Sequence, residues 1–332
     1  MNNIPLQGCN MLYPWLKSYL QQLPSNRLLW PQALLLAGAA DLGGMDLAQH
    51  WAAFLLCHQP KDHHACGQCQ SCHWLQAGHH PDFLVLIKAE DEKVIKIDAI
   101  RELIARLSKT AHSQAAQVIL ISPAESLNTA AANALLKSLE EPKSRVHFLL
   151  VADHHLSLPK TILSRCQTIV LHAAREQSLA WLKTQFRDKA EDDLRQVLRL
   201  ERDLPLAAAR ALTQDDTLQL NAWLDDCVAV ALNQQNPLLV AQKWAGLLKE
   251  PQLRATAYFF LDMVRYSVTH DHLFSIYENR APQIEQLAAR FSLNKCLEHC
   301  QSIWTLYSET IQGLNLNFQL ALECRLLALA EE

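Results

Sequence analysis

Four cysteines are the residues of this chain whose type and spacing most clearly suggest chemistry: Cys57, Cys66, Cys69 and Cys72. They fall within sixteen residues, and Gly67 and polar residues between them allow tight turns. Four thiolates at this spacing are typical of tetrahedral zinc coordination. Because four protein ligands leave no open position for water, we expect a structural Zn²⁺ ion rather than a catalytic one.

Other interpretations of the cysteines remain open. An iron–sulfur cluster is the chemical rival, but the sequence lacks the further Cys-Pro step of the bacterial ferredoxin pattern. The thiols could also be free and buried without a metal. A histidine could replace one cysteine as a ligand. The histidines of this region are His58, His63, His64, His73, His79 and His80.

A second stretch, from Gly38 to Met45, lies where a nucleotide-binding protein carries its phosphate loop. A working loop needs glycines for close backbone approach, a lysine that reaches the phosphates and a Ser or Thr that holds Mg²⁺. The glycines include Gly38 and Gly43. However, Gly44 stands at the lysine position and Met45 at the Ser/Thr position. The loop is degenerate, and we expect no ATP to be bound by this chain.

Acidic residues are also misplaced for nucleotide chemistry. Asp41 lies within the loop, where it would repel phosphate oxygens. The apolar run 118–121 predicts the strand that should end in acidic residues for Mg²⁺ and the attacking water. Ser122 and Pro123 follow it instead, and Glu125 comes one to two residues late. Two independent catalytic elements are missing, so we expect no ATP hydrolysis by this domain.

Strand and helix signals alternate through the first half of the chain. The predicted strands are 33–37, 83–87, 118–121, 147–151 and 168–171. The predicted helices between them are at about 46–56, 100–107 and 128–139. This alternation is typical of an α/β fold, in which helices cover a parallel sheet.

The second half of the chain predicts helices alone. Residues 174–212 predict three short helices, and the pattern stays helical from residue 213 onward. The last predicted helix, 317–329, is apolar on most of its circumference. Such a helix either lies at the centre of its own bundle or completes an interface with another subunit, and the sequence leaves both alternatives open.

Length and composition limit the class of protein. The 332 residues exceed the size at which single cores stop growing, so two or three domains are expected. A formal charge of −4 argues against DNA binding through the overall electrostatic field of the protein surface. Residues 1–5 show no secretory signal, and the apolar run 33–40 is too short to cross a bilayer. We expect a cytoplasmic protein without membrane association, in which disulfides are the weaker explanation for the ten cysteines.

Several strings together resemble one family over essentially the whole chain, the AAA+ clamp-loader subunits of bacterial DNA polymerase III. The strings are Tyr13–Leu16, the four-cysteine module at 57–72, Asn133–Pro142 and Leu163–Cys166. The last two are highly specific. In that family, the zinc module is shared by the gamma/tau ATPase and by the delta-prime subunit, which has no ATPase activity. The degenerate phosphate loop makes this chain similar to the delta-prime branch.

The resemblance implies an architecture and partners. Residues 1–172 would form a AAA+ domain with the zinc module, 173–212 a three-helix lid, and 213–332 an all-α collar in a five-subunit assembly. The implied partners are the gamma/tau and delta subunits and, through the complex, the sliding clamp (beta) and primer–template DNA. Two departures agree with an idle ATP site. Ala152-Asp153 stands where an ATPase has a polar sensor, and Leu206 occupies the position of the sensor arginine in the lid.

The same resemblance gives Arg165, in the string Ser164-Arg165-Cys166, a catalytic role in trans. Its guanidinium would reach the ATP held by a neighbouring gamma/tau subunit and stabilise charge on the transferring phosphoryl group. In NTPases this effect contributes a factor of about 10³–10⁵ in rate. No residue of the chain is expected to act in cis, so the chain would serve as a non-catalytic component of a DNA-directed DNA polymerase, a nucleotidyltransferase.

Two rival functions are testable alternatives. The first is an active gamma/tau-type ATPase, which should bind ATP as a purified protein, and Gly44 and Met45 argue against it. The second is a zinc-dependent regulator that binds nucleic acid. It should show salt-dependent DNA binding as an isolated chain, and the acidic charge balance argues against it.

Overall fold

The computed structural model describes residues 12–38, 40–89, 92, 94–107, 116–141, 145–213, 216–273, 275–313 and 316–331. The chain divides into two compact units. The first consists of Met1–Trp181 with Leu204–Leu206, and the second of Leu182–Asp203 with Ala207–Glu332. Residues 1–5, where no secretory signal is expected, and Pro142 of the second family string lie outside the described residues.

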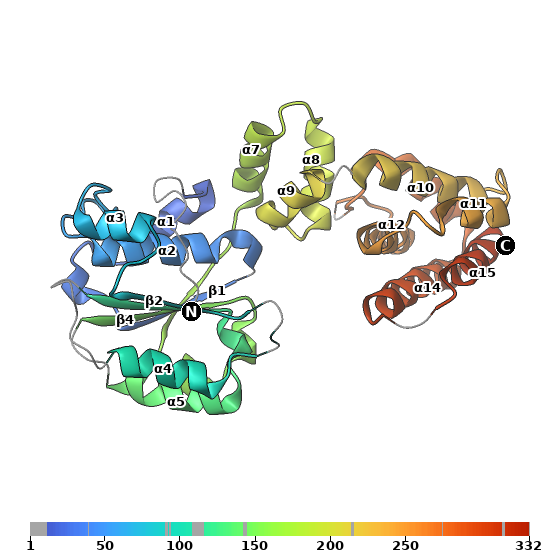
Figure 1. Ribbon diagram of the computed structural model, residues 1–332. Helices are drawn as coiled ribbons and strands as arrows, with labels where there is room; N and C mark the ends of the chain where they lie inside the picture. The colour runs from blue at the N-terminus through green and yellow to red at the C-terminus, as the bar shows by residue number, and fades with distance from the viewer. Residues whose placement is uncertain are drawn as a thin grey trace. The chain divides into compact units, whose positions relative to one another are not determined.

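A five-stranded parallel sheet forms the centre of the first unit (Figure 1). Its strands are β1 (Ala33–Ala37), β2 (Phe83–Ile87), β3 (Gln117–Ser122), β4 (Val146–Ala152) and β5 (Gln167–Val170). They are ordered β2-β3-β4-β1-β5, and every pair is parallel. The five predicted strands and the parallel α/β class are confirmed, each strand to within one residue at either end.

Helices cover both faces of the sheet, which explains why every residue of β1 and β4 is buried. The side chains of β4 alternate between two cores. Leu149 and Val151 belong to one, with α1 (Lys17–Leu20), α2 (Gly44–Leu56) and α3 (Gln70–Gln76) on its side (Figure 1). Phe148 and Leu150 belong to the other. On that side lie α4 (Ile97–Leu107), α5 (Thr129–Glu140) and α6 (Lys160–Leu163).

This sheet topology fixes where a ligand site would lie. In open parallel sheets, ligands bind at the carboxyl ends of the strands. Leu36 of β1 pairs with Val151 of β4 and with Ile169 of β5, so the loops after these strands emerge at the same edge. The degenerate phosphate loop follows β1 at that edge.

The second unit contains helices and their connections, with no strand among its described residues. After α7 (Arg175–Gln185), its helices are α8 (Glu191–Leu200), α9 (Pro205–Thr213), α10 (Asp216–Ala231), α11 (Pro237–Trp244), α12 (Glu250–Thr269), α13 (Ala281–Arg290), α14 (Leu293–Ile311) and α15 (Phe318–Ala330). The three short helices predicted for 174–212 are present as α7, α8 and α9.

Two buried polar side chains of the second unit, Trp223 and Asp262, are hydrogen-bonded within its core. The indole N–H of Trp223 on α10 donates to Thr256 Oγ1 on α12 at 2.7 Å. The carboxylate of Asp262 on α12 accepts hydrogen bonds from the Ser275 hydroxyl and from the backbone N–H groups of Ile276 and Tyr277, at 2.7–3.0 Å. These bonds fix the connection between α12 and α13, because a buried carboxylate without donors would be costly.

The last helix, α15, has two different faces. Leu322, Leu326 and Leu329 are buried in the core of the second unit. On the same helix, Leu320 and Leu327 remain 54% and 39% exposed. One face therefore belongs to its own bundle, while an apolar remainder faces solvent in the isolated chain.

Among the described helices, none combines the length with the apolar character that a membrane span requires.

The start of α5 offers a test of local helix stability. The Asn128 side chain accepts a hydrogen bond from the Ala131 backbone N–H at 2.8 Å. We expect Asn128→Ala to lower the free energy of unfolding of the first unit by about 1 kcal/mol, because that N–H loses its cap. Asn128→Asp should retain most of the stability. Urea unfolding followed by tryptophan fluorescence measures both, and equal loss in the two variants would contradict the capping role.

Candidate functional site

The four predicted cysteine ligands come together at the end of α2. Cys57 caps that helix, Cys66 and Cys69 lie in the following connection, and Cys72 lies in the first turn of α3. Their Sγ atoms all lie within 4.8 Å of one another. Four of the Sγ–Sγ distances are 3.5 Å, 3.7 Å, 3.9 Å and 3.9 Å.

These distances fit a tetrahedral metal site. A tetrahedron with metal–sulfur bonds of about 2.3 Å has sulfur–sulfur edges of about 3.8 Å. A disulfide would require about 2.0 Å, and all four cysteines are free thiols. The cluster contains cysteines alone among the described residues, so no histidine joins it. The four thiols can therefore hold one metal ion and leave no ligand position open.

Backbone groups prepare the thiols for ligation, which requires the thiolate. Gly67 adopts a φ of +74°, and the Cys66 N–H donates to Cys57 Sγ at 3.2 Å. The backbone hydrogen bond from Gln68 is the main reason that the pKa of Cys66 is lowered to about 6. Burial raises the pKa values of Cys57 and Cys72 instead. A metal cation would offset this cost by stabilising the thiolates.

Neighbouring side chains anchor the module to α2. Ser71 Oγ donates to the Leu56 carbonyl at 2.7 Å and lies 2.9 Å from His80 Nε2. Burial lowers the pKa of His80 to about 4, so this histidine is a neutral structural partner near pH 7. On the other side, Arg27 donates to the carbonyls of Leu55 and Cys57 at 2.9 Å and 2.6 Å.

The phosphate-loop region has the expected strand–loop–helix path, and apolar side chains pack closely against two of its glycines. Gly43 has a φ of +77°, and a Cβ built on it would lie 2.8 Å from the Tyr13 ring. A Cβ on Gly44, the lysine position, would lie 3.2 Å from Leu171 and 3.4 Å from Val151. The start of a lysine side chain would therefore meet apolar groups rather than open space.

Three aromatic rings close the loop. Tyr13 stacks on Trp15 with ring centroids 5.0 Å apart, and Trp181 packs edge-on against both rings. The Trp15 indole N–H donates to the Leu42 carbonyl of the loop at 2.9 Å. This cluster of Tyr13, Trp15 and Trp181 gives the first family string a physical role, which the sequence alone did not indicate.

The acidic residue after β3 is engaged with backbone. Glu125 Oε1 accepts hydrogen bonds from the backbone N–H groups of Asp153 and His154, at 3.0 Å and 3.4 Å. Oε1 thus stabilises the loop after β4, while Oε2 is buried without a hydrogen-bond partner among the described residues. Leu206, at the predicted sensor position, packs against the core of the first unit.

Arg165 lies in the turn after α6, and its side chain is 32% exposed. It forms an ion pair with Glu140, and its Nε donates to Glu140 Oε1 at 2.8 Å. Its Nη1 donates to the Thr161 carbonyl at 2.9 Å. Ser164 donates to that same carbonyl at 3.2 Å, and burial raises the pKa of Cys166 to about 11. Glu140 was not predicted as a partner, because it lies 25 residues away in the chain.

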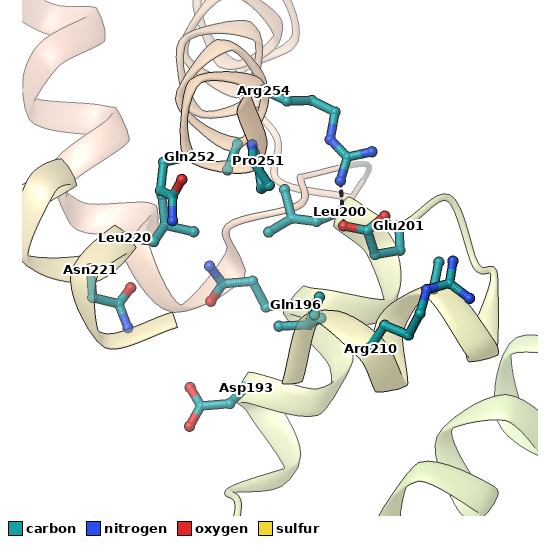
Figure 2. A pocket seen from close by; sticks show the side chains of 14 residues that line it. Asp193, Gln196, Leu200, Glu201, Arg210, Leu220, Asn221, Pro251, Gln252 and Arg254 are labelled. Atoms are coloured by element: carbon teal, nitrogen blue, oxygen red, sulfur yellow. Dashed lines mark hydrogen bonds and ion pairs between the residues drawn. The ribbon is translucent and has the colours of Figure 1, made fainter. Parts of the chain in front are cut away.

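A hollow of about 200 Å³ lies within the second unit (Figure 2). Helices α8, α9, α10 and α12, with the C-cap residue Glu201 of α8, supply its 14 lining residues, and none of these is Gly, Lys, Ser or Thr. Glu201 is paired with Arg254, and Gln196 accepts a hydrogen bond from Asn279 at 3.0 Å. The hollow therefore lacks the glycines, lysine and hydroxyl groups of a phosphate loop, and two of its charged side chains, Glu201 and Arg254, are already paired.

The fold and these sites define a parallel α/β domain in which aromatic rings pack against the loop after β1. Residues 15–175 match the family described as DNA polymerase III, delta subunit, and residues 210–331 match the corresponding C-terminal family. The DNA polymerase III subunit delta' of Pseudomonas aeruginosa is 38% identical over 265 residues, covering 78% of this chain and 79% of that protein.

The chain is also similar to two further DNA polymerase III subunits. The subunit delta' of Yersinia pestis is 31% identical over 303 residues, covering 87% of this chain and 88% of that protein. The subunit tau/gamma of Haemophilus influenzae is 31% identical over 234 residues, covering 64% of this chain but 33% of its own length. The chain belongs to the delta-prime family of DNA polymerase III subunits.

The packing of Tyr13 on Gly43 can be tested with a matched pair of substitutions. Gly43 and Gly67 have similar positive φ angles, but a Cβ on Gly67 would meet nothing within 4 Å. Gly67→Ala should cost about 1–2 kcal/mol through its backbone conformation alone, and Gly43→Ala should cost more. Adding Tyr13→Ala to Gly43→Ala should recover part of the difference. Thermal unfolding measures the order, and equal losses would show that the ring does not limit the loop.

Proposed function

We propose that this chain is a non-ATPase subunit of the DNA polymerase III clamp loader. It joins gamma/tau and delta subunits in a pentamer that places the sliding clamp on primed DNA. It works in the cytoplasm, as a component of the DNA-directed DNA polymerase holoenzyme, and meets the clamp and DNA through the complex. Family membership and the closed phosphate loop support this proposal.

The closed loop is the observation that carries the non-ATPase role. Phosphate binding requires open space over the loop and a cation to offset the charge of the phosphates. Here the Tyr13 ring lies over Gly43, while apolar side chains lie beside Gly44. Met45 offers no hydroxyl for Mg²⁺. The alternative, an active gamma/tau-type ATPase, would need a different loop, and ATP binding by the isolated chain would favour it.

Arg165 is the residue through which the chain acts on ATP. The chain's own phosphate loop offers it no nucleotide to serve, whereas its turn is partly exposed and accessible to a neighbour. A guanidinium can donate two parallel hydrogen bonds to a phosphate and keeps its charge throughout. We therefore assign Arg165 as the catalytic residue for an ATP held by an adjacent gamma/tau subunit, with Ser164 and Cys166 shaping its turn.

The C-terminal residues supply the assembly surface. We assign residues 1–172 to a AAA+ domain, 173–212 to its lid and 213–332 to a collar. Leu320 and Leu327 on α15 are exposed beside a face that is already buried, so a second subunit can cover them. Removing such apolar side chains from water would contribute to a stable complex.

The metal at the cysteine module is Zn²⁺, and its role is structural. The sulfur geometry matches zinc–thiolate bonds, and thiolates are soft ligands that favour zinc among the common cellular metals. Metal binding would tie the connection at 57–72 to the end of α2. The bound ion supplies folding free energy rather than chemistry.

Substituting Arg165 tests the catalytic assignment. In a complex assembled with Arg165→Ala, hydrolysis at the ATP site opposite Arg165 should slow by about 10³-fold or more, because the transition-state charge loses its guanidinium. ATP hydrolysis stimulated by clamp and primed DNA is the measurement. Arg101→Ala, a change at a 67% exposed arginine on α4, is the matched control. Unchanged turnover with Arg165→Ala would exclude the assignment.

A cysteine substitution tests the metal assignment. Cys69→Ser should reduce bound zinc from one equivalent per chain to well below that value and lower the melting temperature. Structural zinc contributes about 10–16 kcal/mol to the folding of small peptides. Cys324→Ser removes an exposed thiol far along the chain and should change neither quantity. If Cys69→Ser kept both its zinc and its melting temperature, the four-thiolate site would be wrong.

A further inference from the structure

The guanidinium of Arg165 is almost fully occupied by its own chain. Its Nε and one Nη2 hydrogen are directed at Glu140, and its Nη1 donates to the Thr161 carbonyl at 2.9 Å and the Ser164 hydroxyl at 3.3 Å. An arginine has five N–H donors. Among the described residues, these contacts engage four, which leaves one for a neighbour's phosphate. A two-point contact with phosphate therefore requires the release of an existing partner.

Glu140 is the partner most easily released. It is the last residue of α5, where the helix dipole disfavours a carboxylate, so its negative charge is stabilised there mainly through Arg165. The Glu140 and Arg165 side chains are 47% and 32% exposed. Exposed ion pairs contribute little to stability because water competes for both charges. By contrast, the Thr161 carbonyl belongs to the adjoining helix α6 and moves with the turn.

We propose that Glu140 holds Arg165 in position until phosphates of the neighbour's nucleotide replace its carboxylate. This inference rests on the proposed role of Arg165 in trans. Carboxylate and phosphate bind the same two-donor edge of a guanidinium, so they compete for it directly. Glu140 is thus a positioning residue. It keeps Arg165 ordered at the surface, and its release is coupled to the arrival of ATP.

The competition has a measurable consequence. When a binding-competent state is only fractionally populated, the apparent affinity of its ligand falls by that fraction. Glu140 lowers the fraction of Arg165 that is free to meet a phosphate. Replacing its carboxylate by a neutral amide should therefore strengthen nucleotide binding at the neighbour's site, while the chemical step, whose transition state Arg165 stabilises, is left unchanged.

A complex assembled with Glu140→Gln tests the proposal. The apparent KM for ATP should fall by about two- to fivefold with kcat unchanged, the size expected for one exposed ion pair. Glu141→Gln removes the same charge one residue further along and should leave both constants at the parent values. Glu140→Asp keeps the carboxylate and should keep KM closer to the parent than Glu140→Gln does. An unchanged KM, or a fall in kcat, in Glu140→Gln would overturn the proposal.

The Arg165→Ala turnover and an NMR measurement distinguish a failure of the inference about Glu140 from a failure of the proposed role of Arg165. If Arg165→Ala leaves turnover unchanged, the role in trans is wrong. If Arg165→Ala lowers turnover while Glu140→Gln leaves KM unchanged, only the inference about Glu140 is wrong. In the isolated full chain, NMR exchange of the Arg165 Nε–H should be faster in Glu140→Gln than in Glu141→Gln. Equal rates would show that Glu140 does not hold the guanidinium.

Discussion

The contact between the Tyr13 ring and Gly43 is the constraint on which the first unit depends. A glycine with positive φ lets the ring approach the backbone, and Trp15 and Trp181 hold the ring there. The ring thereby packs directly against the backbone of the loop after β1. The sheet, its covering helices and the turn that carries Arg165 then form a scaffold around a closed loop, and this gives the non-ATPase proposal its physical basis.

Local sequence predicted the elements well, because the central strands are buried on both faces and appear as continuous apolar runs. The spacing of Cys57, Cys66, Cys69 and Cys72 also sufficed to predict the cluster, since its ligands are close in the chain. The domain limits stay predictions. The catalytic role of Arg165 also stays a prediction, because it concerns an ATP that another chain would hold.

Contacts between residues far apart in the chain could not be predicted from local sequence. The contact of Glu140 with Arg165 and that of Glu125 with the backbone of Asp153 join residues at least 25 positions apart. Each depends on how the sheet brings its loops together, which no local pattern records. The last helix was ambiguous for a related reason. Apolar residues around its circumference give no indication of which face its own bundle covers and which remains for a partner.

The two ends of α2 have a joint consequence. At its first turn, the Tyr13 ring lies against Gly43 and the Trp15 indole N–H donates to the Leu42 carbonyl, and at its last turn Arg27 donates to the carbonyls of Leu55 and Cys57. Contacts with other parts of the chain therefore hold both ends of the helix. Within the proposed clamp-loader subunit, a helix held in this way would provide a fixed reference for the neighbouring subunits.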